Sequence, residues 1–112
     1  MEEFTEVCSL SDVPDNTMKG FTVGGKDILI ANVGGEVHAM DAVCSHMSGY
    51  LPRGQLKGHI VKCPVHGAEF DVRTGKLARG LPWVIRKGTR HEVTDLTSYE
   101  TRVVDTRVWV RL

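Results

Sequence analysis

Two short cysteine–histidine segments in the middle of the chain constrain its fold more than any other feature. Cys44-Ser45-His46 and Cys63-Pro64-Val65-His66 are separated by sixteen residues, and each offers one thiolate and one imidazole from a tight loop. A zinc finger usually takes its cysteines from one segment and its histidines from the other. Mixing both residue types within each segment favours a binuclear metal centre, in which one metal takes both thiolates and the other takes both imidazoles.

Length and composition set the class of protein. The 112 residues are 41% hydrophobic and 25% charged, which predicts one globular domain and excludes disordered, collagen-like and coiled-coil chains. No apolar run approaches the ~20 residues that span a bilayer, and the first residues are acidic where a signal peptide would be basic. We therefore expect a soluble, cytoplasmic protein with no membrane partner, whose three cysteines favour metal binding over disulfides.

The charge is balanced overall and unevenly distributed. Fourteen basic and fourteen acidic residues give no net charge, which removes the general electrostatic case for binding nucleic acid. Residues 1–42 hold eight acidic residues and two lysines, whereas residues 73–91 hold six basic residues and no acidic one. Two readings stay open: two solvated faces that attract each other, or a basic stretch that docks an acidic partner.

Glycine turns between β-rich runs predict antiparallel strands. Gly24-Gly25 joins residues 21–23 to residues 27–31, and Gly34-Gly35 leads into residues 36–40. Paired glycines supply the positive φ angles that tight hairpins need. Residues 99–104 and 107–112 predict a last hairpin around Asp105-Thr106, where an Asp-Gly turn would be usual. Twelve glycines and the lack of any long helical periodicity indicate an all-β fold.

The middle of the chain resembles a known family. The spacing of the two segments, together with the continuation from Gly67 to Lys76, is similar to Rieske-type [2Fe-2S] ferredoxins. The resemblance implies an antiparallel β base domain, residues 1–41 and 81–112, with an inserted loop-rich cluster-binding subdomain at residues 42–80. Within the base, residues 84–95 are expected to form an exposed loop.

The resemblance also implies the cofactor and its ligands. One [2Fe-2S] cluster per chain would be held by Cys44 and Cys63 on one iron and by His46 and His66 on the other. With two neutral imidazoles the oxidised cluster carries no net charge, which raises its potential above that of a four-cysteine cluster. A structural zinc at the same four residues is the alternative that the residues leave open.

Four positions indicate the soluble, low-potential branch of the family. The membrane-bound respiratory branch carries a disulfide between its cluster loops, at positions occupied here by Gly49 and Val65. It also carries a serine and a tyrosine that donate hydrogen bonds to cluster sulfurs, at positions occupied here by Ala68 and Phe70. Without those donors the reduced, more negative cluster is less stable.

The function implied is electron transfer without catalysis. We expect a monomeric carrier that takes one electron from a reductase and passes it to an acceptor such as a terminal oxygenase. The alternatives are a permanent small redox subunit of a larger reductase complex and a zinc-stabilised interaction module. Of the remaining candidate ligands, Cys8 is predicted to be a buried small hydrophobe. His38 is predicted to be an exposed or hydrogen-bonded side chain rather than a ligand. His59 and His91 lie in glycine-rich or charged loops and carry no signal beyond that.

Overall fold

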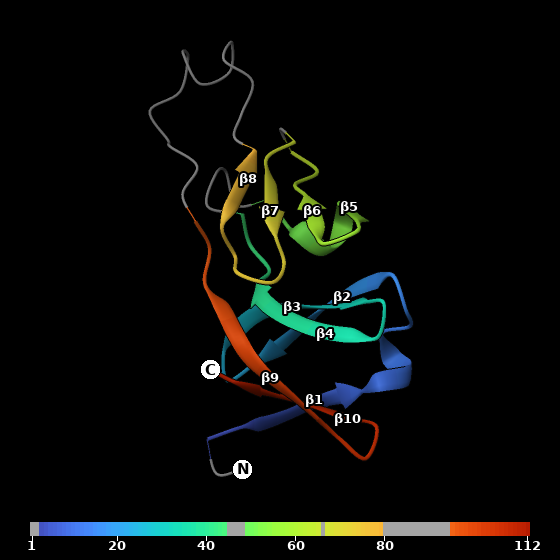
Figure 1. Cartoon of the computed structure of the whole chain (residues 1–112). Helices are drawn as coiled ribbons and strands as arrows, with labels where there is room; N and C mark the ends of the chain where they lie inside the picture. Colours follow the sequence, from blue (N-terminus) through green and yellow to red (C-terminus); the bar gives the residue numbers. More distant parts are fainter. Residues whose placement is uncertain (1–2, 45–48, 66, 80–94) are drawn as a thin grey trace.

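The structure is a computed structural model that describes residues 3–44, 49–65, 67–79 and 95–112, and it is built from two antiparallel sheets (Figure 1). In spatial order the six-stranded sheet contains β1 (Thr5–Ser9), β10 (Arg107–Arg111), β9 (Ser98–Val104), β4 (Glu36–Asp41), β3 (Lys26–Val33) and β2 (Thr17–Val23). The four-stranded sheet contains β5 (Gln55–Lys57), β6 (Ile60–Lys62), β7 (Glu69–Asp71) and β8 (Leu77–Arg79). Two single 3₁₀ turns are η1 (Leu10–Asp12) and η2 (Leu51–Arg53). The expected all-β fold is confirmed.

The three expected hairpins are present. Gly24 and Gly25 join β2 to β3 with φ angles of 58° and 81°, and Gly34-Gly35 joins β3 to β4 in the same way. The β9–β10 hairpin has the same left-handed backbone at Asp105 (φ 49°) and Thr106 (φ 69°), although neither residue is glycine. A threonine with φ above zero is unusual, because its branched Cβ crowds the backbone.

Strand β2 is longer than the sequence predicts. It begins at Thr17 rather than Phe21 and pairs with β3 as far as Asn32. Gly20 lies inside this strand, and a Cβ at this position would overlap the Tyr50 hydroxyl. A glycine weakens the sequence pattern that predicts a strand. At this position the missing Cβ leaves the space that the Tyr50 side chain occupies. Tertiary packing therefore decides the start of β2.

The middle of the chain contains more strand than expected. Residues 42–80 were predicted to be loop-rich, and the structure forms the whole four-stranded sheet from them. Each strand in that sheet has three residues, which is too short to give a recognisable alternation. The separation into a base domain and a cluster-binding subdomain stays a prediction. Of the predicted loop at residues 84–95, only Asp95 lies among the described residues.

Strand β3 divides the core into two hydrophobic clusters. Leu29 and Ala31 point into the first cluster, which includes Cys44 and Cys63 and the buried residues of the four-stranded sheet. Ile28 and Ile30 point the opposite way, into a second cluster with Cys8, Val108 and Val110. The alternation follows from the period of two in a strand. Both faces of β3 are therefore buried, and the cysteines of the paired segments belong to only one of the clusters.

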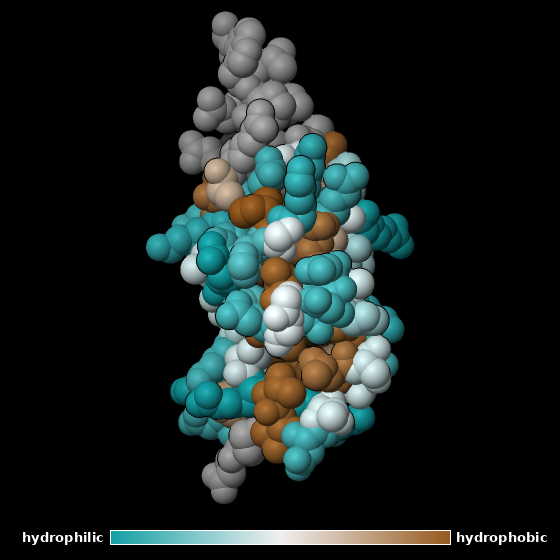
Figure 2. All heavy atoms as spheres, turned by 45° about the vertical axis from the view of Figure 1, so that its right-hand side comes forward, coloured by the Kyte–Doolittle hydropathy of each residue, from teal (hydrophilic) through white to brown (hydrophobic). Residues whose placement is uncertain are grey.

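The outer surface is mixed. Figure 2 shows one largely hydrophilic face on which hydrophobic residues gather in the lower half, over the six-stranded sheet. Across the described residues, no helix has the length and apolar character needed to cross a membrane.

Candidate metal centre

The loop that carries Cys44 is closed at its base by antiparallel hydrogen bonds. After β4 ends at Asp41, Val43 and Tyr50 form an isolated bridge. The Leu51 N–H donates to the Ala42 carbonyl at 2.8 Å, and the Cys44 N–H donates to the Gly49 carbonyl at 2.7 Å. These bonds fix the backbone of Cys44, whose residue surface is only 3% exposed. His46 belongs to this loop and lies outside the described residues.

The loop that carries Cys63 extends the β6–β7 hairpin. The Cys63 N–H donates to the Ala68 carbonyl at 2.7 Å, and the Gly67 N–H donates to the Cys63 carbonyl at 3.1 Å. Cys63 is also 3% exposed. The turn is tight because Gly67 adopts a φ of 80°. His66 precedes this glycine and lies outside the described residues.

The two loops meet at Gly49. A Cβ built on Gly49 would lie 2.5 Å from the Cys63 Sγ and 2.8 Å from a methyl carbon of Val65. The Gly49 carbonyl also accepts the Cys44 N–H bond, so this glycine lies next to the Cys44 backbone and the Cys63 side chain. Fold and sequence thus bring Cys44 and Cys63 into one site from segments that are far apart in the chain.

The donor set fits a metal cluster with thiolate ligands. None of the three cysteines, all of which lie in the described part of the chain, is in a disulfide. Cys44 and Cys63 lie in the same apolar core cluster at the bases of the two facing loops. A buried thiolate needs a positive partner, and a metal ion supplies one. The two thiols therefore suit the sulfur-ligated half of a binuclear centre.

A basic hollow lies beside Cys63. It has a volume of about 340 Å³, and its lining includes Arg53 and Lys62 as well as Cys63 and Gly67. Figure 1 shows η2 and β6, which carry these two basic side chains, side by side in the upper part of the molecule. The outer side of the Cys63 loop is therefore positively charged, whereas its inner side is apolar.

The positions that indicate the low-potential branch also lie at this site. The built Cβ of Gly49 would be 3.5 Å from the Val65 Cβ, which is within the spacing of disulfide-bonded residues. The two positions therefore face each other as the resemblance implies, and neither is cysteine. Ala68 and Phe70 are buried beside the two cysteines in the same core cluster, and neither side chain has a hydroxyl to donate.

Cys8 is separate from this centre, as expected. It lies in the second core cluster and is 5% exposed. Burial raises the pKa of its thiol, and the carboxylate of Asp12 adds to the effect. A buried thiol with a raised pKa is a poor nucleophile and a poor metal ligand. The prediction of a small buried hydrophobe is therefore confirmed.

In the described part of the chain the Nε2 atom of His38 is neither exposed nor hydrogen-bonded, contrary to the prediction, and His59, for which the sequence carries no signal, is in the same position. The Nε2 atoms of both rings are buried and lack a hydrogen-bond partner among the described residues. Both rings lie next to the carboxylate of Glu36, and these three residues form the one group of three or more candidate metal ligands found among the described residues. The spacing Glu36-x-His38 on a strand is a weak signal by itself. His59 is distant in the sequence, so only the fold reveals the group. His91 lies outside the described residues.

Comparison with known proteins gives a family for the chain. The family model described as the Rieske [2Fe-2S] domain matches residues 3–100. The ferredoxin component of the naphthalene 1,2-dioxygenase system of Pseudomonas putida is 39% identical over 74 residues, which cover 66% of this chain and 71% of the relative. The ferredoxin component of biphenyl 2,3-dioxygenase of Rhodococcus jostii (strain RHA1) is 44% identical over 78 residues, which cover 70% and 72%.

Solved structures agree with this result. The ferredoxin of carbazole 1,9a-dioxygenase from Nocardioides aromaticivorans IC177 is 28% identical, with a TM-score of 0.82 over 96% of this chain and 95% of that one. A complex of reduced oxygenase and oxidised ferredoxin in carbazole 1,9a-dioxygenase contains a similar chain, 27% identical, with a TM-score of 0.79 over 99% and 94%. From its sequence, its fold and these matches, the chain belongs to the Rieske [2Fe-2S] domain family.

Proposed function

We propose that this chain is a one-electron carrier that holds a [2Fe-2S] cluster between its two cysteine loops. The observation that carries the proposal is the meeting of those loops, in which Gly49 accepts the Cys44 N–H bond and lies against the Cys63 Sγ. Membership of the Rieske [2Fe-2S] domain family supports the same cofactor. When bound, such a cluster takes up and releases single electrons.

In this proposal the four residues of the two segments are the ligands. Cys44 and Cys63 bind one iron through their thiolates, and His46 and His66 bind the other through their imidazoles. Backbone hydrogen bonds at the base of each loop hold the cysteines, and the apolar core behind them excludes water. Ala68 and Phe70 withhold hydroxyl donors, which keeps the reduction potential low.

The relatives indicate the kind of partner. The two relatives described above are ferredoxin components of dioxygenase systems, and one similar structure is a complex of an oxygenase with a ferredoxin. We infer that this chain receives its electron from a reductase and delivers it to a terminal oxygenase. It acts as a cytoplasmic monomer without substrate chemistry of its own. The basic hollow beside Cys63 supports a partner whose docking surface is acidic.

The cofactor is tested by analysis of the purified protein and of ligand variants. We expect iron and acid-labile sulfide in equal amounts, and an electron paramagnetic resonance signal in the reduced state. Cys44→Ser, His46→Ala, Cys63→Ser and His66→Ala should each abolish or alter that signal. Cys8→Ser and His91→Ala are the matched controls and should retain it. Zinc bound by the same four residues in place of iron would contradict the proposal and support the interaction module.

The role as a carrier is tested by mixing. The chemically reduced protein, mixed rapidly with an oxidised terminal oxygenase of the dioxygenase type, should lose one electron per chain as the oxygenase cluster becomes reduced. Gel filtration of cell extract gives the second measurement. Elution only in a large complex with a reductase, together with a failure to reduce any oxygenase, would show that the chain is a permanent subunit and not a mobile carrier.

A further inference from the structure

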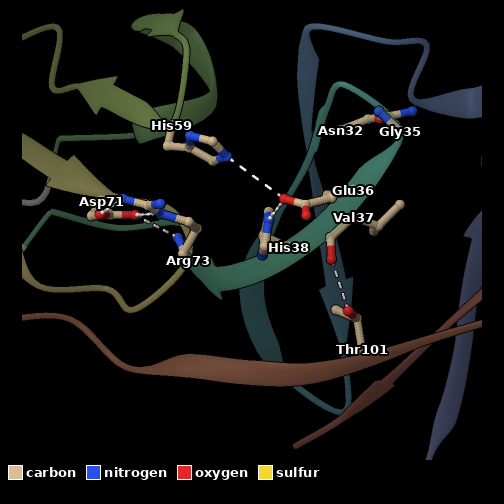
Figure 3. Close-up of polar contacts among 9 residues, drawn as sticks. All are labelled: Asn32, Gly35, Glu36, Val37, His38, His59, Asp71, Arg73 and Thr101. Carbon is tan, nitrogen blue, oxygen red and sulfur yellow. Dashed lines mark hydrogen bonds and ion pairs between the residues drawn. The ribbon is translucent and has the colours of Figure 1, made fainter.

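Three potential metal ligands from both sheets converge on one point away from the cysteine loops. Glu36 and His38 lie two residues apart on β4, so their side chains project from the same face of the strand. His59 lies in the turn between β5 and β6 of the other sheet. Figure 3 shows both imidazole rings directed at the Glu36 carboxylate, which lies between them.

The distances in this group are too long for hydrogen bonds. The Nε2 of His38 is 3.5 Å from one carboxylate oxygen of Glu36, and the Nε2 of His59 is 3.7 Å from the same oxygen. A nitrogen–oxygen hydrogen bond spans about 2.7–3.2 Å. Both nitrogens are buried and have no hydrogen-bond partner among the described residues. Buried polar atoms are normally satisfied, so two unpartnered atoms directed at one point call for a ligand.

The same distances fit a bound metal ion. Zinc binds histidine nitrogen at about 2.0–2.1 Å and carboxylate oxygen at about 2.0–2.2 Å, so two ligand atoms in a tetrahedral site lie roughly 3.3–3.5 Å apart. The two contacts of 3.5 and 3.7 Å are close to that separation, and all three ligand atoms lie within 4.8 Å of one another. We propose that Glu36, His38 and His59 form a second metal site, which binds a divalent transition-metal ion such as Zn²⁺.

The surroundings favour a dication. Arg73 is the nearby cation, and it is held by Asp71 through two hydrogen bonds of 3.0 and 2.8 Å (Figure 3). Because this pair is neutral as a unit, Arg73 does not neutralise the Glu36 carboxylate beside the two imidazoles. The Glu36 side chain is 69% exposed, which gives the ion a path from solvent and leaves a coordination position for water.

The site would join the two sheets. Glu36 and His38 belong to the six-stranded sheet, and His59 lies in the β5–β6 turn of the four-stranded sheet. An ion bound by all three residues only in the folded chain stabilises that chain, and the stabilisation grows with the logarithm of the free ion concentration once that concentration exceeds the Kd. The inference does not depend on the proposed electron transfer, because none of the three residues is in the two cysteine–histidine segments.

The test is zinc binding to the purified, cluster-loaded protein. Gel filtration into a buffer without chelator precedes the measurement. The buffer has a pH of about 7.5, because imidazole binds metal in its neutral form. Calorimetric titration with Zn²⁺ should give one saturable site. Glu36→Gln, His38→Gln and His59→Gln should each weaken zinc affinity by about tenfold or more. Asp15→Asn and His91→Gln are the matched controls and should bind zinc as the parent protein does. The visible spectrum of the cluster checks that every variant is folded and loaded.

A thermal measurement gives an independent readout. Zinc should raise the unfolding midpoint of the parent protein and of both controls, and it should leave the midpoint of the three ligand variants unchanged. Zinc binding that survives in His38→Gln and His59→Gln would assign the ion to other residues and overturn the proposal. An absence of saturable zinc binding to the parent protein would overturn the proposal as well.

Discussion

At the scale of single residues, Gly49 controls how closely the two cysteine loops approach. Adding a methyl group in Gly49→Ala would bring a carbon to 2.5 Å from the Cys63 Sγ, so the loops must separate. We expect a loss of bound cluster and a cost of about 1–3 kcal/mol in the free energy of unfolding. The measurement is iron content per chain, together with the visible spectrum.

Gly58→Ala is the control for this prediction. A Cβ at Gly58 meets nothing within 4 Å, although its φ of +60° makes the substitution strained. It should therefore reduce stability by about 1 kcal/mol and leave the cluster content unchanged. Equal cluster loss in both variants would mean that Gly49 acts through overall stability alone.

Ala68 and Phe70 are the residues predicted to tune the potential. Both are buried in the core cluster that contains Cys44 and Cys63. A hydroxyl directed at a cluster sulfur favours the reduced state by about 1–2 kcal/mol, which corresponds to roughly 40–90 mV per donor for one electron. Phe70→Tyr and Ala68→Ser should each raise the midpoint potential, and the double variant should raise it further. An unchanged midpoint with an intact cluster would show that the two positions serve packing only.

At the scale of elements, the β9–β10 hairpin carries strain in its turn. Thr106 has a φ of 69°, which a β-branched residue rarely adopts, and its carbonyl accepts a hydrogen bond from the Leu10 N–H at 2.7 Å. Thr106→Gly removes the strain and keeps this backbone bond. The free energy of unfolding should rise by about 0.5–1 kcal/mol in a denaturant titration. Asp105→Gly should give a smaller gain, because aspartate tolerates the left-handed region better. A lower stability of Thr106→Gly would contradict this account.

The contact between β4 and β9 predicts a dependence on alkaline pH. The Tyr99 hydroxyl donates to the Asp41 carboxylate at 2.5 Å. Burial and this hydrogen bond raise the pKa of Tyr99 to about 12, from about 10 in an unfolded chain. Because the fold favours the neutral hydroxyl, its contribution to stability is complete below about pH 10 and is lost between about pH 10 and 12.

The variant Tyr99→Phe isolates this effect. At pH 8 the parent protein should be more stable than Tyr99→Phe by about 1 kcal/mol, a value that allows for partial solvent exposure. This difference in stability should shrink between about pH 10 and 12. Thr101→Val on the same strand removes a hydrogen bond to the Val37 carbonyl that does not titrate, so its cost should stay constant. A constant difference for both variants would argue against a raised pKa at Tyr99.

At the scale of the whole molecule, the two core clusters should respond differently to loss of the iron. Only one of them contains Cys44 and Cys63, together with Val61, Phe70 and Val72 of the four-stranded sheet region. The other includes Ile28, Ile30 and Val108 and contains neither Cys44 nor Cys63. Hydrogen exchange of the cluster-free protein should increase around the first cluster and stay slow around the second. Uniform acceleration would contradict the predicted division into a base domain and a cluster-binding subdomain.

The local features of this protein follow from its amino-acid sequence. Paired glycines specify two hairpins because tight turns require positive φ angles, and alternation predicts the final strand. The paired Cys44 and Cys63 segments predict a metal centre because their spacing and residue types suit few other roles. Each of these signals lies within a few residues of the chain.

Features that depend on contacts between distant segments are visible in the folded chain alone. It pairs β1 with β10 and β4 with β9 across most of the chain, and it builds a sheet from strands of three residues. It also brings His59 to Glu36 and His38, which the sequence separates by twenty residues or more. Sheet order and packing follow from the burial of many weak contacts at once, so no local pattern contains them.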